Sequence, residues 1–208
     1  LYSRAVQELV RLGDLEALRV FAKASNDLTL GEMRQLSALD ALQFSEDDYE
    51  FLIRAKTAAL FSGACEVGAL CGATRFREAM AAYGSHLGMA FQVTDDLLDY
   101  TEASETVGKP RGLDLKEHKV TLPLIAALRS MSAVSRGAVD ELFANPEPDD
   151  SQIARVIDIV NEEGGLDYAR EWGERYASRA DDVLSGLPDS PARRALQDTL
   201  TYVMERRA

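Results

Sequence analysis

Apolar side chains recur at helical spacing from one end of this 208-residue chain to the other. Few segments alternate between apolar and polar residues in the way that strands do. Gly, Pro, Asn and Asp interrupt the pattern at intervals typical of helix lengths, so we predict an all-α fold in one domain, residues 1–208. The expected helices cover 1–12, 14–25, 29–39, 45–71, 74–100, 115–131 with a break at Pro123, 135–144, 150–163, 166–184 and 190–206.

Local signals predict several helix ends. Ser45 with Asp48 three residues later resembles a capping box. Gly13, Gly72, Gly164 and Gly186 are expected to end helices, because glycine adopts the backbone conformation of a helix C-terminus most readily.

The charge balance constrains the kind of ligand that the chain binds. Its 35 acidic against 23 basic residues give a formal net charge of -12, which repels phosphate backbones and anionic lipid. Nucleic acid is therefore not an expected partner. An anionic ligand has to be held by a local group of cations, or by a metal ion that several carboxylates bind.

The compartment and the limits of the chain are also matters of expectation. Cys65 and Cys71 lie six residues apart on an expected helix and face different directions, so we predict no local disulfide and a reducing, cytoplasmic environment. The most apolar stretch, 57–73, contains Glu66 and is too short to span a bilayer. Because Leu1 opens directly into a helical pattern, we expect the chain to be the later part of a longer protein.

A lysine interrupts the apolar seam of the expected helix 45–71. Tyr49, Ile53 and Leu60 follow the inward positions, and Lys56 occupies the position where another apolar residue is expected. An unpaired buried ammonium group is costly, so two arrangements remain open. Either Lys56 extends its charged end to solvent along its aliphatic stem, or it meets concentrated negative charge.

Three acids interrupt the next expected helix. Its apolar stripe, which includes Leu87 and Phe91, continues in register to Asp95 and Asp99, with Asp96 beside them and Gln92 one turn before. Carboxylates this close repel one another unless a cation joins them, and oxygen ligands on one helix face suit Mg²⁺. The alternative is a solvated surface, as expected for the acid pairs elsewhere in the chain. We favour the metal site, because the three acids are expected on the buried stripe of the helix and because four cations follow. These cations indicate a phosphorylated ligand, and they are Lys109, Arg111, Lys116 and Lys119.

Other common chemistries lack their motifs. The segment around Gly108 and Lys109 is no P-loop, since Pro110 replaces the Ser or Thr that would follow the lysine. His86 and His118 are far from each other and from either cysteine in the sequence, which gives a zinc site or a Cys–His dyad no support.

Several spaced segments together resemble the trans-isoprenyl diphosphate synthase family. The run from Gly88 to Asp99 resembles the second aspartate-rich region of these enzymes. Further matching segments lie on both sides of this run, and together they cover nearly the whole chain: Gly31-Glu32 with Gln35, Lys56-Thr57-Ala58, Gly108-Lys109-Pro110, Asp114-Leu115 and Lys119-Val-Thr-Leu-Pro-Leu124.

This resemblance implies helices around a central cavity and a head-to-tail prenyltransferase that joins isopentenyl diphosphate to an allylic diphosphate. Mg²⁺ would bridge the acids to the substrate diphosphate. The resemblance implies metal binding by Asp95, Asp96 and Asp99. It implies that Lys56 and Lys109 bind the diphosphate and act in catalysis, and that Thr57 and Gln92 place oxygen atoms near the allylic cation. Lys119 and Gln35 would contact the substrate. The resemblance also implies a homodimer.

The chain departs from the family pattern at two points. The first aspartate-rich motif and the basic segment for isopentenyl diphosphate are absent, so we expect the N-terminal helices of the family to be missing. His118 replaces the glycine that usually precedes the lysine at 119. Two alternatives to the enzyme remain open: a non-catalytic partner subunit of a prenyl diphosphate synthase, and a helical terpene cyclase.

Overall fold

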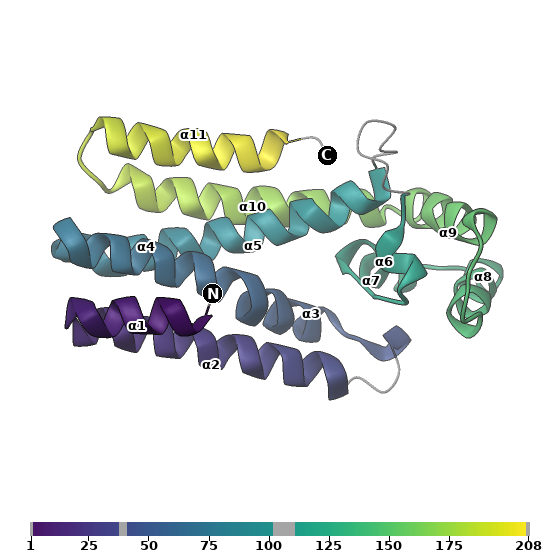
Figure 1. Ribbon diagram of the computed structural model, residues 1–208. Helices are drawn as coiled ribbons and strands as arrows, with labels where there is room; N and C mark the ends of the chain where they lie inside the picture. Colours follow the sequence, from purple (N-terminus) through teal and green to yellow (C-terminus); the bar gives the residue numbers. More distant parts are fainter. Residues whose placement is uncertain (1, 38–40, 102–110, 207–208) are drawn as a thin grey trace. The chain divides into compact units, whose positions relative to one another are not determined.

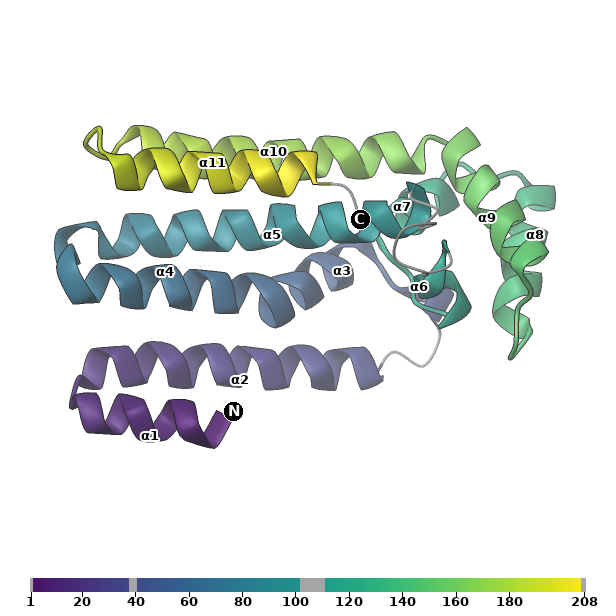
Figure 2. The ribbon, with the colours of Figure 1, turned by 45° about the horizontal axis from the view of Figure 1, so that its top comes forward.

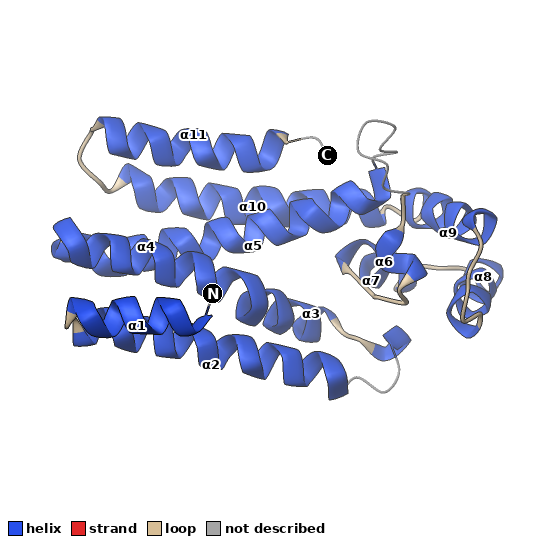
Figure 3. Ribbon diagram, viewed as in Figure 1, coloured by secondary structure: helices blue, strands red, loops and turns tan. Residues whose placement is uncertain are grey.

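The predicted helical class is confirmed by a computed structural model that describes residues 2–37, 41–101 and 111–206. These residues form helices joined by turns, and they contain no strand (Figure 3). The main helices are α1 (Tyr2–Leu12), α2 (Leu15–Ser37), α3 (Glu46–Ile53), α4 (Ala59–Gly72), α5 (Arg77–Thr101), α6 (Leu113–Lys116), α7 (Leu122–Leu128), α8 (Ala133–Ala144), α9 (Asp150–Glu162), α10 (Gly165–Ser185) and α11 (Pro191–Glu205) (Figure 1).

The chain divides into two compact units, and several helices contribute to both. The first unit consists of Leu1–Ser37, Phe51–Met89 and Tyr176–Thr201, and the second of Ala38–Glu50, Ala90–Arg175 and Tyr202–Ala208. The expectation of one domain over residues 1–208 stays a prediction.

In the first unit, α1 and α2 form a helical hairpin (Figure 2). Gly13 joins them with φ +72°, as its position after the last turn of α1 predicts. Asp14 then starts α2 by accepting hydrogen bonds from the backbone N–H groups of Glu16 and Ala17. The expected break between residues 25 and 29 was wrong, because α2 continues to Ser37. Asp27 lies inside the helix and pairs with Lys23 one turn earlier, at 3.1 Å.

The expected helix 45–71 is interrupted in its middle. Its start is confirmed, since Ser45 and Asp48 exchange the two hydrogen bonds of a capping box, at 3.1 and 3.3 Å. However, residues 54–58 form one π-helical turn between α3 and α4. A π turn adds a residue to the turn and rotates everything after it relative to the preceding face. Tyr49 and Ile53 are therefore buried as predicted, whereas Leu60 is exposed.

Glycines let the first half of α5 approach α4 and the π turn closely. A methyl group on Gly84 would lie 2.7 Å from the carbonyl carbon of Phe61, and one on Gly88 would lie 2.6 Å from the Cα of Ala58. The hydroxyl of Ser62 donates to the Ala81 carbonyl at 2.9 Å across the same contact. This packing brings the backbone of α5 against the turn that carries Lys56.

Short helices make up most of the second unit. The break predicted at Pro123 lies earlier in the structure, because α6 ends at Lys116 and Pro123 stands in the first turn of α7, where a missing N–H costs nothing. Asp149 and Gln152 form a capping box at the start of α9, which packs against α8 (Figure 2). Gly164, with φ +75°, separates α9 from α10 as predicted.

Two observations bear on the compartment and on membrane association. Cys65 and Cys71 are free thiols. Among the helices of the described residues, none combines the length and the apolar character that crossing a bilayer requires.

The close contact at Gly84 predicts a stability change. Gly84→Ala forces backbone against backbone and should lower the free energy of unfolding by about 1–3 kcal/mol. Gly68→Ala is the matched control, because this glycine is exposed in the interior of α4 with no atom near its added methyl group. It should raise the free energy of unfolding by about 0.5–1 kcal/mol. Urea unfolding of both variants measures the difference, and equal effects would contradict the close packing.

Candidate active site

Lys56 lies in the π turn of the first unit, where it meets negative charge. Its Nζ lies 2.9 Å from a carboxylate oxygen of Glu32 and donates a hydrogen bond to Oε1 of Gln35 at 2.7 Å. Both partners lie on α2, and the Lys56 side chain remains 31% exposed. Of the two arrangements left open by the sequence, the structure has the one with a charge partner.

Close approach of α2 allows this contact. A methyl group on Gly31 would lie 2.9 Å from the Cγ of Lys56, so glycine is needed where the lysine stem crosses the helix. Thr57 is half-buried on the same π turn. Single π turns inside α-helices occur often at functional sites. The roles predicted for Lys56 and Thr57 stay predictions.

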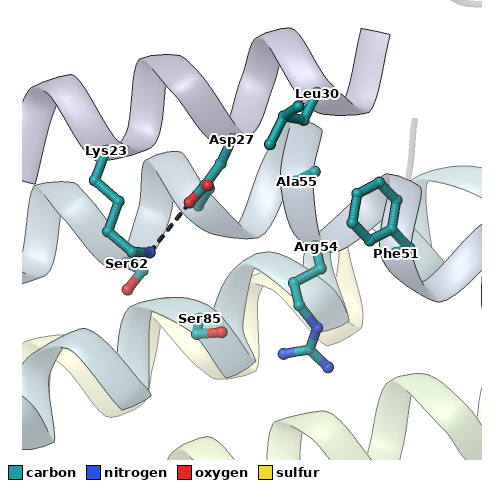
Figure 4. A pocket seen from close by; sticks show the side chains of 9 residues that line it. Lys23, Asp27, Leu30, Phe51, Arg54, Ala55, Ser62 and Ser85 are labelled. Carbon is teal, nitrogen blue, oxygen red and sulfur yellow. Dashed lines mark hydrogen bonds and ion pairs between the residues drawn. The ribbon is translucent and has the colours of Figure 1, made fainter. Parts of the chain in front are cut away.

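A cavity of about 340 Å³ opens beside this turn in the first unit (Figure 4). Its lining includes the small residues Ala55 and Ala59 and the larger side chains of Leu30 and Phe51. None of the predicted site residues that the structure describes lines it. The remaining lining residues are Lys23, Asp27, Arg54, Ser62 and Ser85.

The three acids of α5, in the second unit, have different environments. The expectation that Asp95 lies on the buried stripe was wrong, because its side chain is 55% exposed. Asp96 is the buried acid, with 5% exposure, on the same face as Met89 and Val93. Seven residues separate Met89 from Asp96, which is about two helical turns, whereas Asp95 is rotated about 100° away from Asp96.

Asp96 is enclosed by two hydrogen-bond donors. The Tyr49 hydroxyl donates to its Oδ2 at 2.5 Å, and Nε2 of Gln92 donates to its Oδ1 at 2.9 Å. Burial raises the pKa of Asp96 to about 7, although both hydrogen bonds favour the charged form. Burial and the Asp96 charge also raise the pKa of Tyr49 well above its ordinary value.

Asp99 is half-buried and ties the end of α5 to the turn before α6. Its two carboxylate oxygens accept hydrogen bonds from the backbone N–H groups of Leu113 and Asp114, at 3.0 and 3.1 Å. Burial and the nearby Asp114 charge raise the pKa of Asp99. Lys119 lies 3.3 Å from Asp114 and 2.6 Å from Glu117, and its pKa is raised, most by the Glu117 hydrogen bond.

Asp114 therefore joins the cluster of acids, although no role was predicted for it. Its place in one of the segments that carry the family resemblance was the available signal.

The backbone at His118 has a conformation that favours glycine. It has φ +55°, in the left-handed region that glycine adopts without strain. The ring partly offsets this cost, because it lies 3.0 Å from the carbonyl oxygen of Asn145 through Nε2 and 5.5 Å from the Phe143 ring. Lys119 directly follows this reversal, and its N–H donates to the Asp114 carbonyl at 2.8 Å.

A cation next to Asp95, Arg206, was not among the residues predicted from the sequence. Arg206 donates to Oδ1 of Asp95 at 2.8 Å and lies over the ring of Phe91, 4.1 Å from its centre. Only 16% of its side chain is exposed, and its buried Nε has no hydrogen-bond partner among the residues that the structure describes. The available signal was the Arg206-Arg207 pair near the end of an acidic chain.

The second unit thus brings Gln92 to Asp96, and Lys119 to the acids near Asp99, while the first unit brings Gln35 to Lys56. Lys109 lies outside the described residues. No group of three or more His, Cys, Asp or Glu side chains in the described part of the chain forms a ready metal site. Asp95 nevertheless fits a hard divalent cation in donor chemistry and exposure, and Arg206 contacts only its Oδ1, whereas both carboxylate oxygens of Asp96 and Asp99 accept hydrogen bonds.

Comparison with known proteins extends the resemblance. Residues 1–160 match the family model described as polyprenyl synthetase. The chain is 37% identical to an all-trans-nonaprenyl-diphosphate synthase (geranyl-diphosphate specific) of Rhodobacter capsulatus, over 99% of this chain and 63% of that protein. An octaprenyl diphosphate synthase of Haemophilus influenzae is also 37% identical, over 94% of this chain and 60% of its own length. The chain thus spans about three fifths of the length of these curated relatives.

A solved structure agrees with the sequence matches. Polyprenyl synthase from Caulobacter crescentus CB15, complexed with calcium and isoprenyl diphosphate, superposes with a TM-score of 0.92 at 33% identity. The match covers 100% of this chain and 64% of that one.

The raised pKa of Asp96 predicts a pH-dependent stability. The folded state binds the Asp96 proton more tightly than the unfolded state, whose pKa is near 3.8, so this residue's contribution to stability falls as the pH rises from about 4 to about 7. Asp96→Asn should remove that fall, measured as the free energy of unfolding in urea with a chelator present. Asp158→Asn, at an exposed position of α9, should keep it. A pH dependence in Asp96→Asn identical to that of the unmodified chain would contradict the buried carboxylate.

Proposed function

Since this chain belongs to the polyprenyl synthetase family, we propose that its protein condenses isopentenyl diphosphate with an allylic diphosphate to make polyprenyl diphosphate. The observation that carries the proposal is the acid cluster of the second unit, in which Asp95 stays exposed while Asp96 and Asp99 are held by hydrogen bonds. An exposed carboxylate beside two fixed ones suits a cation-dependent site for a polyphosphate ligand.

The residues divide into roles by their chemistry. Lys56, Lys109 and Lys119 are the proposed diphosphate contacts, because an ammonium group stabilises the negative charge of a leaving phosphate. Lys56 is held by Glu32 and Gln35, and its side chain is partly exposed. The side-chain oxygens of Thr57 and Gln92 are proposed to lie near the allylic carbon. Gln35 is a proposed substrate contact beside Lys56, from which it accepts a hydrogen bond.

In the proposed reaction, the bond between the allylic carbon and the diphosphate oxygen breaks, and the diphosphate keeps the electron pair. Mg²⁺, held by Asp95 with support from the other acids, would stabilise this departing charge. The lysines stabilise the same charge as it develops. The double bond of isopentenyl diphosphate then attacks the allylic cation, and a proton passes to the departing diphosphate. Apolar helix faces keep water away from the cation.

The alternatives are less well supported. Both named relatives are prenyl diphosphate synthases, which gives neither a terpene cyclase nor a non-catalytic subunit a specific observation in its favour. Magnesium as the natural cation, assembly as a homodimer and location in the cytoplasm are further parts of the proposal. The cation rests on the oxygen donors of α5, and the dimer on the family resemblance.

The proposed role of Asp95 predicts a large loss of activity. Asp95→Ala in the complete protein should slow condensation of farnesyl and isopentenyl diphosphates by at least about a hundredfold, because charge stabilisation in the transition state is lost. Radiolabelled isopentenyl diphosphate measures the rate. Asp158→Ala removes an exposed acid from α9 and serves as the matched control, with turnover close to that of the unmodified protein. Near-normal turnover of Asp95→Ala would rule out the role.

Lys56 should act mainly on one of the two substrates. Lys56→Ala should weaken binding of the allylic diphosphate more than that of isopentenyl diphosphate, because only the allylic diphosphate is the leaving group. Binding of each substrate is measured separately by calorimetry. Arg19→Ala removes an exposed cation of the same unit that pairs with Glu16 and does not line the cavity, and we expect it to leave both affinities unchanged. Equal losses for both substrates in Lys56→Ala would remove Lys56 from this assignment.

A further inference from the structure

We infer that Tyr49 and Asp96 are positioning residues. They determine which end of the Gln92 side-chain amide, Oε1 or Nε2, faces the substrate. This inference rests on the proposed function, and it assigns a role to Tyr49 that neither the sequence motifs nor the resemblance supplied. It also separates Asp96 from Asp95, because it makes Asp96 an orienting group rather than a metal ligand.

The three side chains form one continuous hydrogen-bonded chain within the second unit. Tyr49 comes from α3, while Gln92 and Asp96 lie one turn apart on α5. Each carboxylate oxygen of Asp96 accepts one hydrogen bond, from the Tyr49 hydroxyl at 2.5 Å and from Nε2 of Gln92 at 2.9 Å. Tyr49 is 2% exposed and Asp96 5% exposed, so water does not compete for either contact.

This arrangement selects one orientation of the Gln92 amide. The ionised form of Asp96, which both hydrogen bonds favour, only accepts hydrogen bonds, so it binds the NH₂ end of a neighbouring amide and repels the carbonyl end. With Nε2 turned to Asp96, Oε1 of Gln92 is turned to the other side. A carbonyl oxygen is the end that stabilises a developing carbocation, whereas the NH₂ end would destabilise it.

Tyr49 determines whether Asp96 keeps this arrangement. A buried carboxylate with a single donor would be under-satisfied, and the remaining oxygen would seek another partner. The Tyr49 hydroxyl donates to Oδ2 of Asp96, so Oδ1 stays available to Nε2 of Gln92. Removing the hydroxyl frees Asp96 to rotate, and Gln92 then loses its fixed orientation without any change in its own chemistry.

The test is a double-mutant cycle in the complete protein, with farnesyl and isopentenyl diphosphates as substrates. Tyr49→Phe should lower kcat about tenfold, a typical loss when a group that orients an active residue is removed. The KM for isopentenyl diphosphate should stay within about twofold, because Gln92 acts on the cation rather than on binding. In a Gln92→Leu background, Tyr49→Phe should cause no further loss of kcat, since both changes remove the same interaction.

Tyr83→Phe is the matched control for the loss of a buried tyrosine hydroxyl. Tyr83 is fully buried in the first unit, and its hydroxyl donates to the Leu196 carbonyl at 2.8 Å. Both variants should lower the midpoint of urea unfolding by comparable amounts, but Tyr83→Phe should leave kcat within about twofold of the unmodified protein. This comparison separates positioning of Gln92 from a general loss of stability.

Two further measurements keep the inference testable if Tyr49→Phe folds poorly. Asp96→Asn should lower kcat without changing the magnesium concentration that gives half-maximal activity, whereas Asp95→Asn should raise that concentration. Independently of activity, the side-chain amide resonances of Gln92 should shift in Tyr49→Phe and Asp96→Asn but not in Tyr83→Phe.

Each outcome decides between distinct conclusions. The inference is wrong, and the proposed function stands, if the unmodified protein is active but the kcat losses from Tyr49→Phe and Gln92→Leu multiply in the double variant. The same conclusion follows if Tyr83→Phe lowers kcat as much as Tyr49→Phe does. If Asp96→Asn raises the magnesium requirement as much as Asp95→Asn, Asp96 is a metal ligand and the inference is also wrong. If the complete unmodified protein does not condense the substrates, the proposed function fails, and the amide resonances alone then decide whether Tyr49 orients Gln92.

Discussion

Burying the carboxylate of Asp96 is the constraint around which the end of α5 is organised. An unsatisfied carboxylate inside a protein costs several kcal/mol, and hydrogen-bond donors on both oxygens reduce that cost. Tyr49 and Gln92 supply these donors, and the Tyr49 hydrogen bond joins α3 to α5 in the second unit. The neighbouring acids differ for the same reason: Asp99 finds two backbone N–H groups, and Asp95 stays exposed beside Arg206.

The first unit solves the corresponding problem for a cation. Lys56 crosses α2 at Gly31, where the absence of a side chain makes room for its stem, and its amine reaches Glu32 and Gln35. The π turn changes the direction in which side chains leave the helix after Ile53. A straight α-helix would carry the apolar seam on to Leu60, which the structure leaves exposed. Backbone irregularity and a polar pairing thus occur together at Lys56.

Much of the fold could be predicted from particular residues. Gly13, Gly164 and the Ser45–Asp48 capping box end or start helices as expected, because these signals act within a few residues of themselves. The errors occurred where tertiary contacts outweigh local preference. A helix break was predicted at Asn26 and Asp27, but both residues lie inside α2. A break was also predicted at Pro123, which lies in the first turn of α7. The candidate residues were found by their types and spacing. The order of burial among Asp95, Asp96 and Asp99 was predicted wrongly, because the predicted stripe advances mostly by four residues and the helix has 3.6 residues per turn.

The sequence by itself determined the all-α class, the family and the acidic and basic residues that are candidates for the site, since periodicity and motifs depend on neighbours along the chain. Only the tertiary structure decided which acid is buried, which partner each charge finds, and that Tyr49, Asp114 and Arg206 belong with the acids of α5. The physical reason is that burial and hydrogen bonding depend on residues far apart in the sequence. Tyr49 lies 47 positions from Asp96, and Arg206 lies 111 from Asp95. No pattern of local spacing carries that information.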